Sequence, residues 1–268
     1  MDRVLIAAHR GRFGGNIVEN TLPAFEAAIR CGADIVEADI RKTADGVMIL
    51  YHDPSAKRLL ALPGGVEDYT LAELRRHTLL NAIGEPSGLY VNTLDEMLTA
   101  LKGRVMINLD QCWNFLDEVY DRVEAMGMAD QALIKSRPPY GPALDWLKSR
   151  GWAPCFIPVI TRDEEILLYE ALPDEAKTPI VEVFAHKEQD RVLSPAFVAS
   201  VRERGRGLWL NALSLSQNVT LCARHDDDLS ITVSPDQGWG WLIDHGATVI
   251  QTDWALELKN YLAQRTAP

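Results

Sequence analysis

Two carboxylates stand close together in a stretch of the sequence that otherwise has the composition of a buried strand. Glu37 and Asp39 interrupt the apolar run IVEADI, residues 35–40. Side chains at positions i and i+2 of a strand project from the same face, so these two acids point the same way. Because two ionised carboxylates on one crowded face repel each other, the pair predicts a cation between them. Oxygen ligands favour one hard divalent cation, Mg²⁺ or Ca²⁺, over zinc.

A histidine is predicted to reach the same place from the next strand. Residues 45–46 read Asp-Gly, the dipeptide favoured in two-residue type I′ hairpin turns, so residues 47–52 are expected to fold back. If these are the two turn residues, His52 falls opposite Asp39, whereas a shift of one residue moves it near Glu37. Directly opposite side chains have Cβ atoms roughly 4.5–5.5 Å apart. The hairpin therefore predicts an imidazole beside the cation.

Two further candidates follow the first apolar run of the chain, which ends in His9 and Arg10. Hydrolysis of a phosphodiester needs positive charge beside the phosphoryl oxygens, one group that activates the nucleophile and one that protonates the leaving alkoxide. Arg10 and the cation are expected to supply the charge. The two imidazoles of His9 and His52 are the candidate acid and base, because imidazole is the side chain best suited to both roles near neutral pH.

These candidates need a fold that brings the ends of several strands together. Short runs rich in Val, Ile and Leu alternate with stretches of helical period along almost the whole chain. Eight βα units in about 250 residues are the expected size of a closed barrel. The Gly-x-Gly-x-x-Gly fingerprint of an open dinucleotide-binding sheet does not follow the first run. The predicted strands are residues 4–9, 35–40, 105–110, 132–136, 155–160, 179–186, 207–213 and 249–254.

The predicted fold class is therefore α/β, a single (βα)8 TIM-type barrel. No linker rich in Pro, Gly or Ser divides the chain, so residues 1–268 are expected to form one domain, with residues 54–92 as an insertion after the second strand and its hairpin. Reacting groups in such barrels collect at the C-terminal ends of the strands. Asp110, which ends the third strand, is thus a further carboxylate, and Lys135 near the end of the fourth is a further cation. The predicted helices are residues 21–32, 70–77, 93–101, 115–127, 143–151, 163–172, 195–205, 238–246 and 256–265.

Composition excludes several kinds of partner. The formal net charge of −11 opposes a broad nucleic-acid surface and an anionic membrane patch, while a small anionic substrate in a local basic pocket is compatible with it. The four cysteines show no Cys-x-x-Cys spacing, which indicates reduced thiols. No run approaches the ~18 apolar residues of a membrane span. We expect a cytoplasmic protein without membrane insertion, and nothing in the sequence indicates a homo-oligomer.

The sequence resembles the glycerophosphodiester phosphodiesterase family in several motifs. These are HRG after the first strand, the stretch ENTLPAFEAAIRCGADIVEADIRKTADGVMILYHD, the segments YTLAELRRH and NTLDEML, and the closing GATVIQTD. The resemblance covers most of the chain. It implies a (βα)8 barrel and a small phosphodiester substrate. It also implies a divalent cation held by Glu37 and Asp39, His9 and His52 as the acid/base pair, and Arg10 on the phosphate.

The third strand departs from the family pattern. Where the family typically has a metal-binding Glu and, two residues on, a phosphate-binding Lys, this chain has Asp110 and Cys112. Asp110 keeps a carboxylate that is one methylene shorter, and is expected to be the third metal ligand. Cys112 cannot replace the charge of the lysine. We hypothesise that Lys135 supplies that charge from the neighbouring strand and binds the substrate phosphate.

Some candidates also have plainer interpretations. Asp53 either caps the backbone or orients His52, and Glu182 either lines the pocket or pairs with a neighbouring cation. The aspartates at 226–228 are most simply a solvated loop, with a second cation site as the alternative. Two other functions remain open: a phospholipase-D-like or sugar-phosphodiester hydrolase on the same site, and a non-catalytic barrel that binds phosphorylated ligands.

Overall fold

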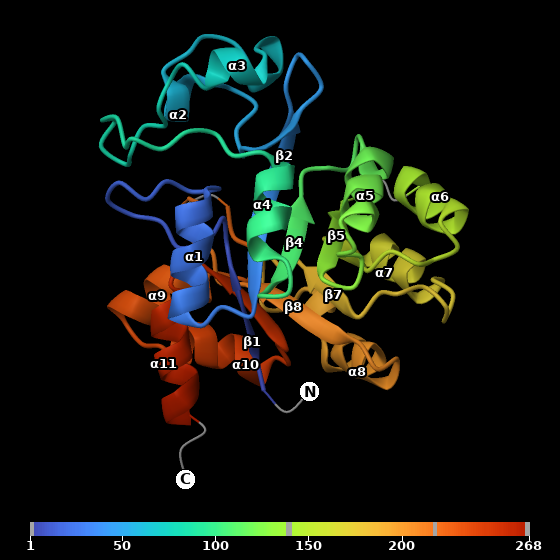
Figure 1. Cartoon of the computed structure of the whole chain (residues 1–268). Helices are drawn as coiled ribbons and strands as arrows, with labels where there is room; N and C mark the ends of the chain where they lie inside the picture. The colour runs from blue at the N-terminus through green and yellow to red at the C-terminus, as the bar shows by residue number, and fades with distance from the viewer. Residues whose placement is uncertain (1–2, 138–140, 217–218, 266–268) are drawn as a thin grey trace.

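Eight parallel strands form a closed barrel at the centre of the molecule, with helices around it (Figure 1). The computed structural model describes residues 3–137, 141–216 and 219–265. Strand order follows the chain, and the barrel closes because the first strand pairs with both the second and the last. The predicted (βα)8 fold is thereby confirmed. The barrel strands are β1 (Leu5–Ala8), β2 (Ile35–Lys42), β4 (Met106–Asp110), β5 (Ala132–Ser136), β6 (Phe156–Ile160), β7 (Ile180–Val183), β8 (Gly207–Asn211) and β9 (Val249–Thr252).

The helices on the outside of the barrel begin where the sequence offers caps. Thr21 precedes the first helix and its hydroxyl accepts a hydrogen bond from the backbone N–H of Ala24. Thr93 and Glu96 form a capping box at the start of another, each side chain accepting from the other residue's backbone N–H. The outer helices are α1 (Leu22–Cys31), α4 (Leu94–Leu101), α5 (Leu116–Ala125), α6 (Gly141–Ser149), α7 (Asp163–Glu170), α8 (Pro195–Glu203), α9 (Asp227–Thr232), α10 (Trp241–Asp244) and α11 (Ala255–Arg265).

The interior of the barrel changes from apolar to polar along the strands. Every second residue of a barrel strand faces inward. Near the N-terminal ends these residues form a compact apolar cluster, in which Trp209 is fully buried. One inward position further along, the residues are polar and just as deeply buried. They are Glu37, Asn108, Lys135, Glu182, Asn211 and Gln251. One end of the barrel is therefore sealed by apolar packing, and the other end gathers charged groups.

The predicted insertion, residues 54–92, lies beyond the C-terminal end of β2 and stands above the barrel in Figure 1. It holds three short helical segments and packs around a second apolar cluster, in which Leu59 and Leu74 join Ile49 and Tyr51 from the hairpin. The insertion therefore stands on the side of the polar end of the barrel. The helical segments are α2 (Lys57–Leu60), η1 (Val66–Asp68) and α3 (Leu71–Leu74).

The hairpin register predicted from residues 45–46 is wrong by one residue. Strand β3 (Met48–Leu50) pairs with β2 so that Ile40 is opposite Leu50, and the backbone N–H of Tyr51, rather than that of His52, donates to Asp39 O at 3.0 Å. The loop has three residues, with positive φ at Gly46 and not at Asp45. This is a type I turn followed by a left-handed glycine.

A side-chain network explains the longer turn. The Thr43 hydroxyl donates to Asp45 Oδ1 at 2.6 Å and accepts from the backbone N–H of Val47 at 2.9 Å. These bonds hold Thr43 level with Val47, where their backbones also pair. The threonine therefore closes the loop one residue earlier than the Asp-Gly dipeptide alone predicts.

The segment from 226 to 246 also differs from its prediction. Asp226 caps α9 by accepting from the backbone N–H of Leu229, and Asp227 is buried, so the interpretation as a solvated loop is wrong for these two residues. The helix predicted at 238–246 is split into a π-helical turn, η3 (Asp236–Gly240), and the short α10. The buried Asp227 side chain accepts hydrogen bonds from Thr252 and from the Asp253 backbone, which connects this segment to the end of the barrel.

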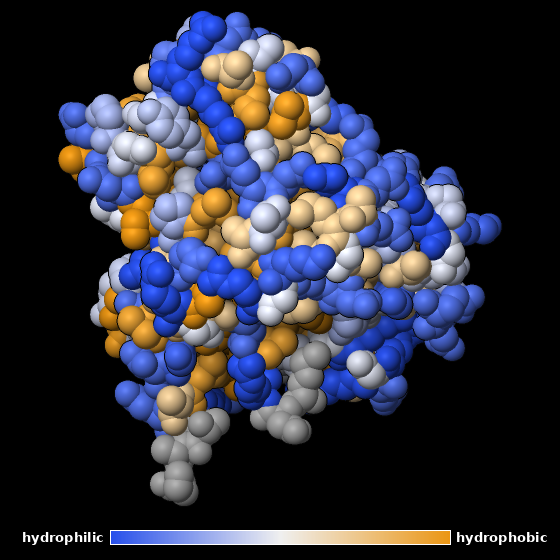
Figure 2. Space-filling model, in the orientation of Figure 1, coloured by the Kyte–Doolittle hydropathy of each residue, from blue (hydrophilic) through white to orange (hydrophobic). Residues whose placement is uncertain are grey.

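In the part of the chain that is described, no helix combines the length and the apolar character needed to cross a bilayer. Hydrophobic residues on the face seen in Figure 2 are interrupted by hydrophilic ones. All four cysteines are free thiols, as predicted.

Candidate active site

Three carboxylates meet at the C-terminal ends of β2 and β4. The two strands pair in parallel with Asp39 level with Asp110, and Glu37 faces the same way as Asp39. One oxygen from each of the three side chains lies within 4.8 Å of the other two, and all three residues are buried. Mg²⁺ and Ca²⁺ take oxygen ligands at about 2.0–2.6 Å, so oxygens this close can share one ion. The structure thus brings together the three residues predicted to hold the cation.

The electrostatics of the cluster favour a cation. Burial, with the neighbouring charges of Asp39 and Asp110, raises the pKa of Glu37 well above its ordinary value. Each carboxylate has further oxygen acceptor capacity that the protein does not fill, since an ionised carboxylate offers about four lone-pair sites. An all-oxygen donor set with spare acceptor capacity fits a hard divalent cation.

The turn after β1 delivers an arginine to the cluster. The backbone N–H of Arg10 donates to Glu37 Oε2 at 2.8 Å, and its Nε lies 3.3 Å from Asp39 Oδ2. Arg10 and Gly11 both have positive φ. A Cβ at position 11 would lie 2.7 Å from the backbone carbon of Ala24 in α1, so only glycine fits there. This explains the His-Arg-Gly sequence at the end of the first strand.

Asp39 is held by two residues with left-handed backbone conformations. Asn20 donates from Nδ2 to Asp39 Oδ2 at 2.9 Å and accepts from the backbone N–H of Asp39 at 3.1 Å. Gln111 donates from Nε2 to Asp39 Oδ1 at 2.8 Å. Both Asn20 and Gln111 have positive φ, a conformation that costs roughly 1–3 kcal/mol and concentrates at functional sites. The fold accepts this strain where it fixes the direction of one carboxylate.

Lys135 lies inside the barrel, below the acidic cluster. Its ammonium is 3.0 Å from Asp110 Oδ2 and 3.1 Å from Glu182 Oε2. Burial acts to lower the pKa of Lys135, but the charges of Asp110 and Glu182 outweigh it and raise the pKa above its ordinary value. The ammonium therefore stays charged. Glu182 therefore pairs with a neighbouring cation, which is the plainer of its two predicted roles. Its side chain also accepts a hydrogen bond from Asn211 at 2.8 Å.

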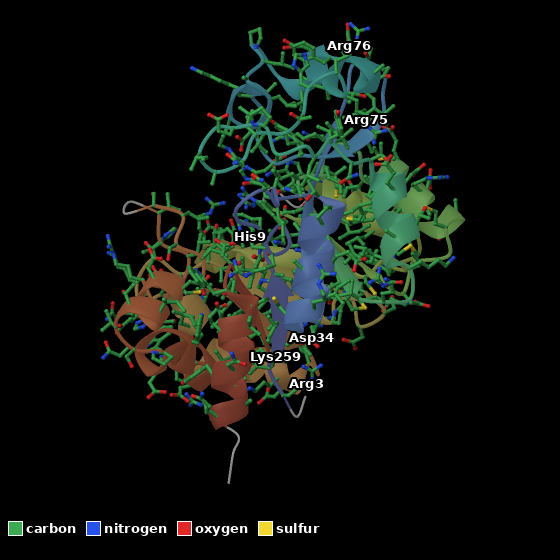
Figure 3. The ribbon with its side chains drawn as sticks, turned by 60° about the vertical axis from the view of Figure 1, so that its left-hand side comes forward. Arg3, His9, Asp34, Arg75, Arg76 and Lys259 are labelled. Atoms are coloured by element: carbon green, nitrogen blue, oxygen red, sulfur yellow. The ribbon has the colours of Figure 1, made fainter. Side chains whose placement is uncertain are left out.

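His9 is oriented by an acid from the last strand. Its Nδ1 lies 2.9 Å from Asp253 Oδ1, and its backbone N–H donates to Thr252 O. Asp227 in turn holds the Asp253 backbone, accepting its N–H at 2.9 Å. Figure 3 shows His9 at the end of the barrel that faces the insertion, with Arg3, Asp34 and Lys259 at the opposite end. The second imidazole nitrogen of His9, Nε2, is left for another partner.

His52 has an equivalent partner in the next residue of the chain. Its Nδ1 lies 2.8 Å from Asp53 Oδ1, which favours the orienting role of Asp53 over a backbone cap. Burial acts to raise the pKa of Asp53, but hydrogen bonds from Arg58 and His52 lower it to about 2. Arg58 also binds Glu19, which accepts from Arg10 at 2.9 Å. One chain of charges thus connects the two histidine-bearing loops.

Two residues with clear positions in the site were missed in the sequence. Asp253 contacts His9, and Gln111 contacts Asp39. The only sequence signal for Asp253 was its place after the last strand, in the motif GATVIQTD. Gln111 gave no signal, because its role depends on a backbone conformation that glutamine rarely adopts.

The fold and the site define a class of protein: a (βα)8 barrel with a buried carboxylate cluster, able to hold a cation, at the C-terminal ends of its strands. A family model described as the glycerophosphoryl diester phosphodiesterase family matches residues 9–141. A second model, described as a domain of unknown function, matches residues 156–262. A glycerophosphodiester phosphodiesterase of Bacillus altitudinis is 34% identical over 140 residues, which are 49% of this chain and 57% of that relative.

Solved structures agree over nearly the whole chain. A glycerophosphoryl diester phosphodiesterase from Parabacteroides distasonis has a TM-score of 0.79 at 22% identity, covering 98% of this chain and 88% of its own. An Oleispira antarctica phosphodiesterase, solved in complex with the product sn-glycerol-3-phosphate, has a TM-score of 0.67 at 16% identity, covering 97% of this chain and 96% of its own. At these identities the structures show the shared barrel.

The resemblance to the glycerophosphodiester phosphodiesterase family seen in the motifs is confirmed, and the family model matches the N-terminal part of the chain, residues 9–141. This match includes β2 and the hairpin. The chain spans little more than half of the Bacillus altitudinis relative. The activity of this chain is accordingly argued below as a proposal.

Proposed function

We propose that this chain is a divalent-cation-dependent phosphodiesterase that hydrolyses a glycerophosphodiester, or a close analogue, to a phosphomonoester and an alcohol. The observation that carries the proposal is the cluster of Glu37, Asp39 and Asp110, whose oxygens lie within 4.8 Å of one another. It sits at the barrel end where Arg10 contacts both acids of β2. The family match over residues 9–141 and the activity for which the Bacillus altitudinis relative is named support the same reaction.

The proposed cation would be held by Glu37, Asp39 and Asp110. When bound, Mg²⁺ or Ca²⁺ supplies Lewis-acid stabilisation of the charge on the phosphoryl oxygens. Arg10 is proposed to bind the phosphate, since its guanidinium lies beside Asp39. Lys135 is proposed to add positive charge from beneath the cluster, where its ammonium contacts Asp110.

His9 and His52 are proposed as the acid/base pair. Each has its Nδ1 bound to a carboxylate, which fixes the ring and leaves Nε2 for the substrate or the nucleophile. One imidazole accepts a proton from the attacking water, and the other donates a proton to the leaving alkoxide oxygen. The cytoplasmic location stays part of this proposal, and four free thiols agree with a reducing compartment.

The test combines turnover with direct cation binding. A panel of glycerophosphodiesters, phospholipids and sugar phosphodiesters is assayed with Mg²⁺, with Ca²⁺ and with chelator. We expect hydrolysis of a glycerophosphodiester that stops on chelation and returns with one of the two ions. Calorimetric binding of that ion should be lost in Glu37→Gln and Asp39→Asn, and kept in the exposed control Glu203→Gln. Full activity after complete chelation would exclude the cation mechanism, and turnover of phospholipids alone would favour the phospholipase-D-like alternative.

A further inference from the structure

Most cations at the C-terminal end of the barrel are already paired with carboxylates. Such pairs neutralise charge that a substrate anion would otherwise attract. Arg41 has no carboxylate partner within the described ranges, but its guanidinium donates to His52 O and to the Gln111 side chain. The paired cations are Arg10 with Glu19 and Asp39, Arg58 with Glu19 and Asp53, Lys42 with Glu118, and Lys135 with Asp110 and Glu182.

Arg137 differs from all of these. It follows β5, two residues beyond Lys135, and it is exposed. Among the described residues, none offers Arg137 a carboxylate within 4.0 Å. Its guanidinium carbon instead lies 5.7 Å from the ring centroid of Trp113 and 5.3 Å from that of Phe184. Two aromatic rings therefore contact a cation that has no direct ion-pair partner among the described residues.

The positions of the two rings place the guanidinium across the barrel mouth. Trp113 comes just after β4, and Phe184 comes directly after β7. Strands β5 and β6 lie between β4 and β7 in the sheet. A side chain from the end of β5 that contacts both rings must therefore extend over the end of the barrel. Together with Lys135, the charge of Arg137 also holds the pKa of Asp110 below its ordinary value against the effect of burial.

We propose that Arg137, whose guanidinium lies over the rings of Trp113 and Phe184, binds the phosphodiester anion of the substrate and adds to Lys135 the positive charge that the third barrel strand lacks at Cys112. This inference rests on the phosphodiesterase activity proposed above and names a residue for its substrate anion. A cation–π contact with the rings leaves the N–H groups of the guanidinium able to bind two phosphoryl oxygens.

The two aromatic rings are expected to restrain the Arg137 side chain before the anion binds. An unpaired surface arginine samples many rotamers, and fixing it on substrate binding costs entropy. Two rings that restrain the side chain beforehand reduce that cost. A lysine at the same place would keep the charge but lose the planar contacts. Substitutions of the rings should therefore weaken anion binding without removing any charge.

The test measures anion binding apart from turnover. The full chain is titrated calorimetrically with sn-glycerol 3-phosphate, with Mg²⁺ present and again with chelator. We expect Arg137→Ala to weaken binding roughly 10- to 100-fold, the range for a hydrogen bond to a charged group. Arg137→Lys and Trp113→Ala should fall between this variant and the unaltered chain. Arg76→Ala, at the outer end of the insertion in Figure 3, is the matched control and should bind normally.

Turnover separates this inference from the proposed function. In an active chain, Arg137→Ala should raise KM for the glycerophosphodiester more than it lowers kcat. Unchanged affinity for sn-glycerol 3-phosphate in Arg137→Ala, with the fold intact by circular dichroism, would overturn the role of Arg137. Absence of binding by the unaltered chain would overturn it as well. Weakened binding in a chain that hydrolyses no phosphodiester would support Arg137 as an anion-binding residue and contradict the proposed function instead.

Discussion

Pairs of a histidine and a carboxylate recur at the end of the barrel, and each pair fixes one imidazole nitrogen. Asp253 contacts His9 and Asp53 contacts His52, in each case through Nδ1. A carboxylate beside Nδ1 favours the tautomer that carries its proton there and leaves Nε2 as the free nitrogen. The two carboxylates thus decide which nitrogen of each ring can meet the substrate.

Removing one of these carboxylates should affect activity more than stability. We expect Asp253→Asn to lower kcat by about 10- to 100-fold, a typical effect of losing a partner that orients a functional histidine. His9→Ala should lower it further, by roughly 10²- to 10⁴-fold. Steady-state kinetics on a glycerophosphodiester checks both values. An Asp253→Asn variant with unchanged kcat would show that the carboxylate does not orient His9 for the reaction.

Local spacing made some of these residues predictable and left others out of reach. Glu37 and Asp39 follow from the two-residue period of a strand, because that period is fixed by the backbone. The partner of His9 lies 244 positions away in the sequence, and no local pattern records such a pairing. The position of Lys135 was predicted, but its two carboxylate neighbours depend on how β4, β5 and β7 are staggered.

At the scale of elements, the hairpin after β2 shows how one side chain changes a register. Prediction from the Asp-Gly dipeptide placed the right elements in the right order and missed the pairing by one residue. The Thr43 hydroxyl decided the loop length, and its two hydrogen bonds have no signature in hydrophobic periodicity. The alternation of strands and helices was predictable over the whole barrel, because the burial of each element leaves a hydrophobic period in the sequence.

Gly46 provides a test of this turn. Its φ is +79°, and no atom lies within 4 Å of the place where a Cβ would stand, so Gly46→Ala adds backbone strain without a clash. We expect it to lower the free energy of unfolding by about 1 kcal/mol. Gly141→Ala, at an open position of α6 without positive φ, is the matched control and should be neutral or stabilising. Urea denaturation measures both, and equal stability of Gly46→Ala and the unaltered chain would contradict the left-handed turn.

At the scale of the whole molecule, one buried acid links stability to pH. Burial raises the pKa of Asp227 to about 7, against hydrogen bonds from Thr252, Trp239 and the Asp253 backbone. The ordinary pKa of this side chain is 3.8, so at pH values between the two pKa values the folded chain binds the proton more tightly than the unfolded chain does. The resulting stabilisation of the folded chain is complete below about pH 4 and is lost as the pH rises through about 7.

The expected outcome is a free energy of unfolding that falls from about pH 4 to about pH 7, with a contribution from Asp227. Asp227→Asn should flatten this dependence, because the amide does not titrate. Asp228→Asn, which alters the next residue and leaves the buried carboxylate in place, should keep the slope of the unaltered chain. Urea denaturation across this pH range is the measurement. The same slope in Asp227→Asn and Asp228→Asn would assign the pH dependence to other groups.

Closure of the barrel has a consequence for how the protein is made. A nascent chain leaves the ribosome N-terminus first, so β1 is released long before β9. Until β9 joins, one edge of β1 stays without a partner and His9 has no Asp253 beside it. Synthesis that stops early therefore yields chains that already contain Glu37, Asp39 and both histidines but hold His9 without its acid. A fully ordered site therefore requires that synthesis has passed the last strand of the barrel.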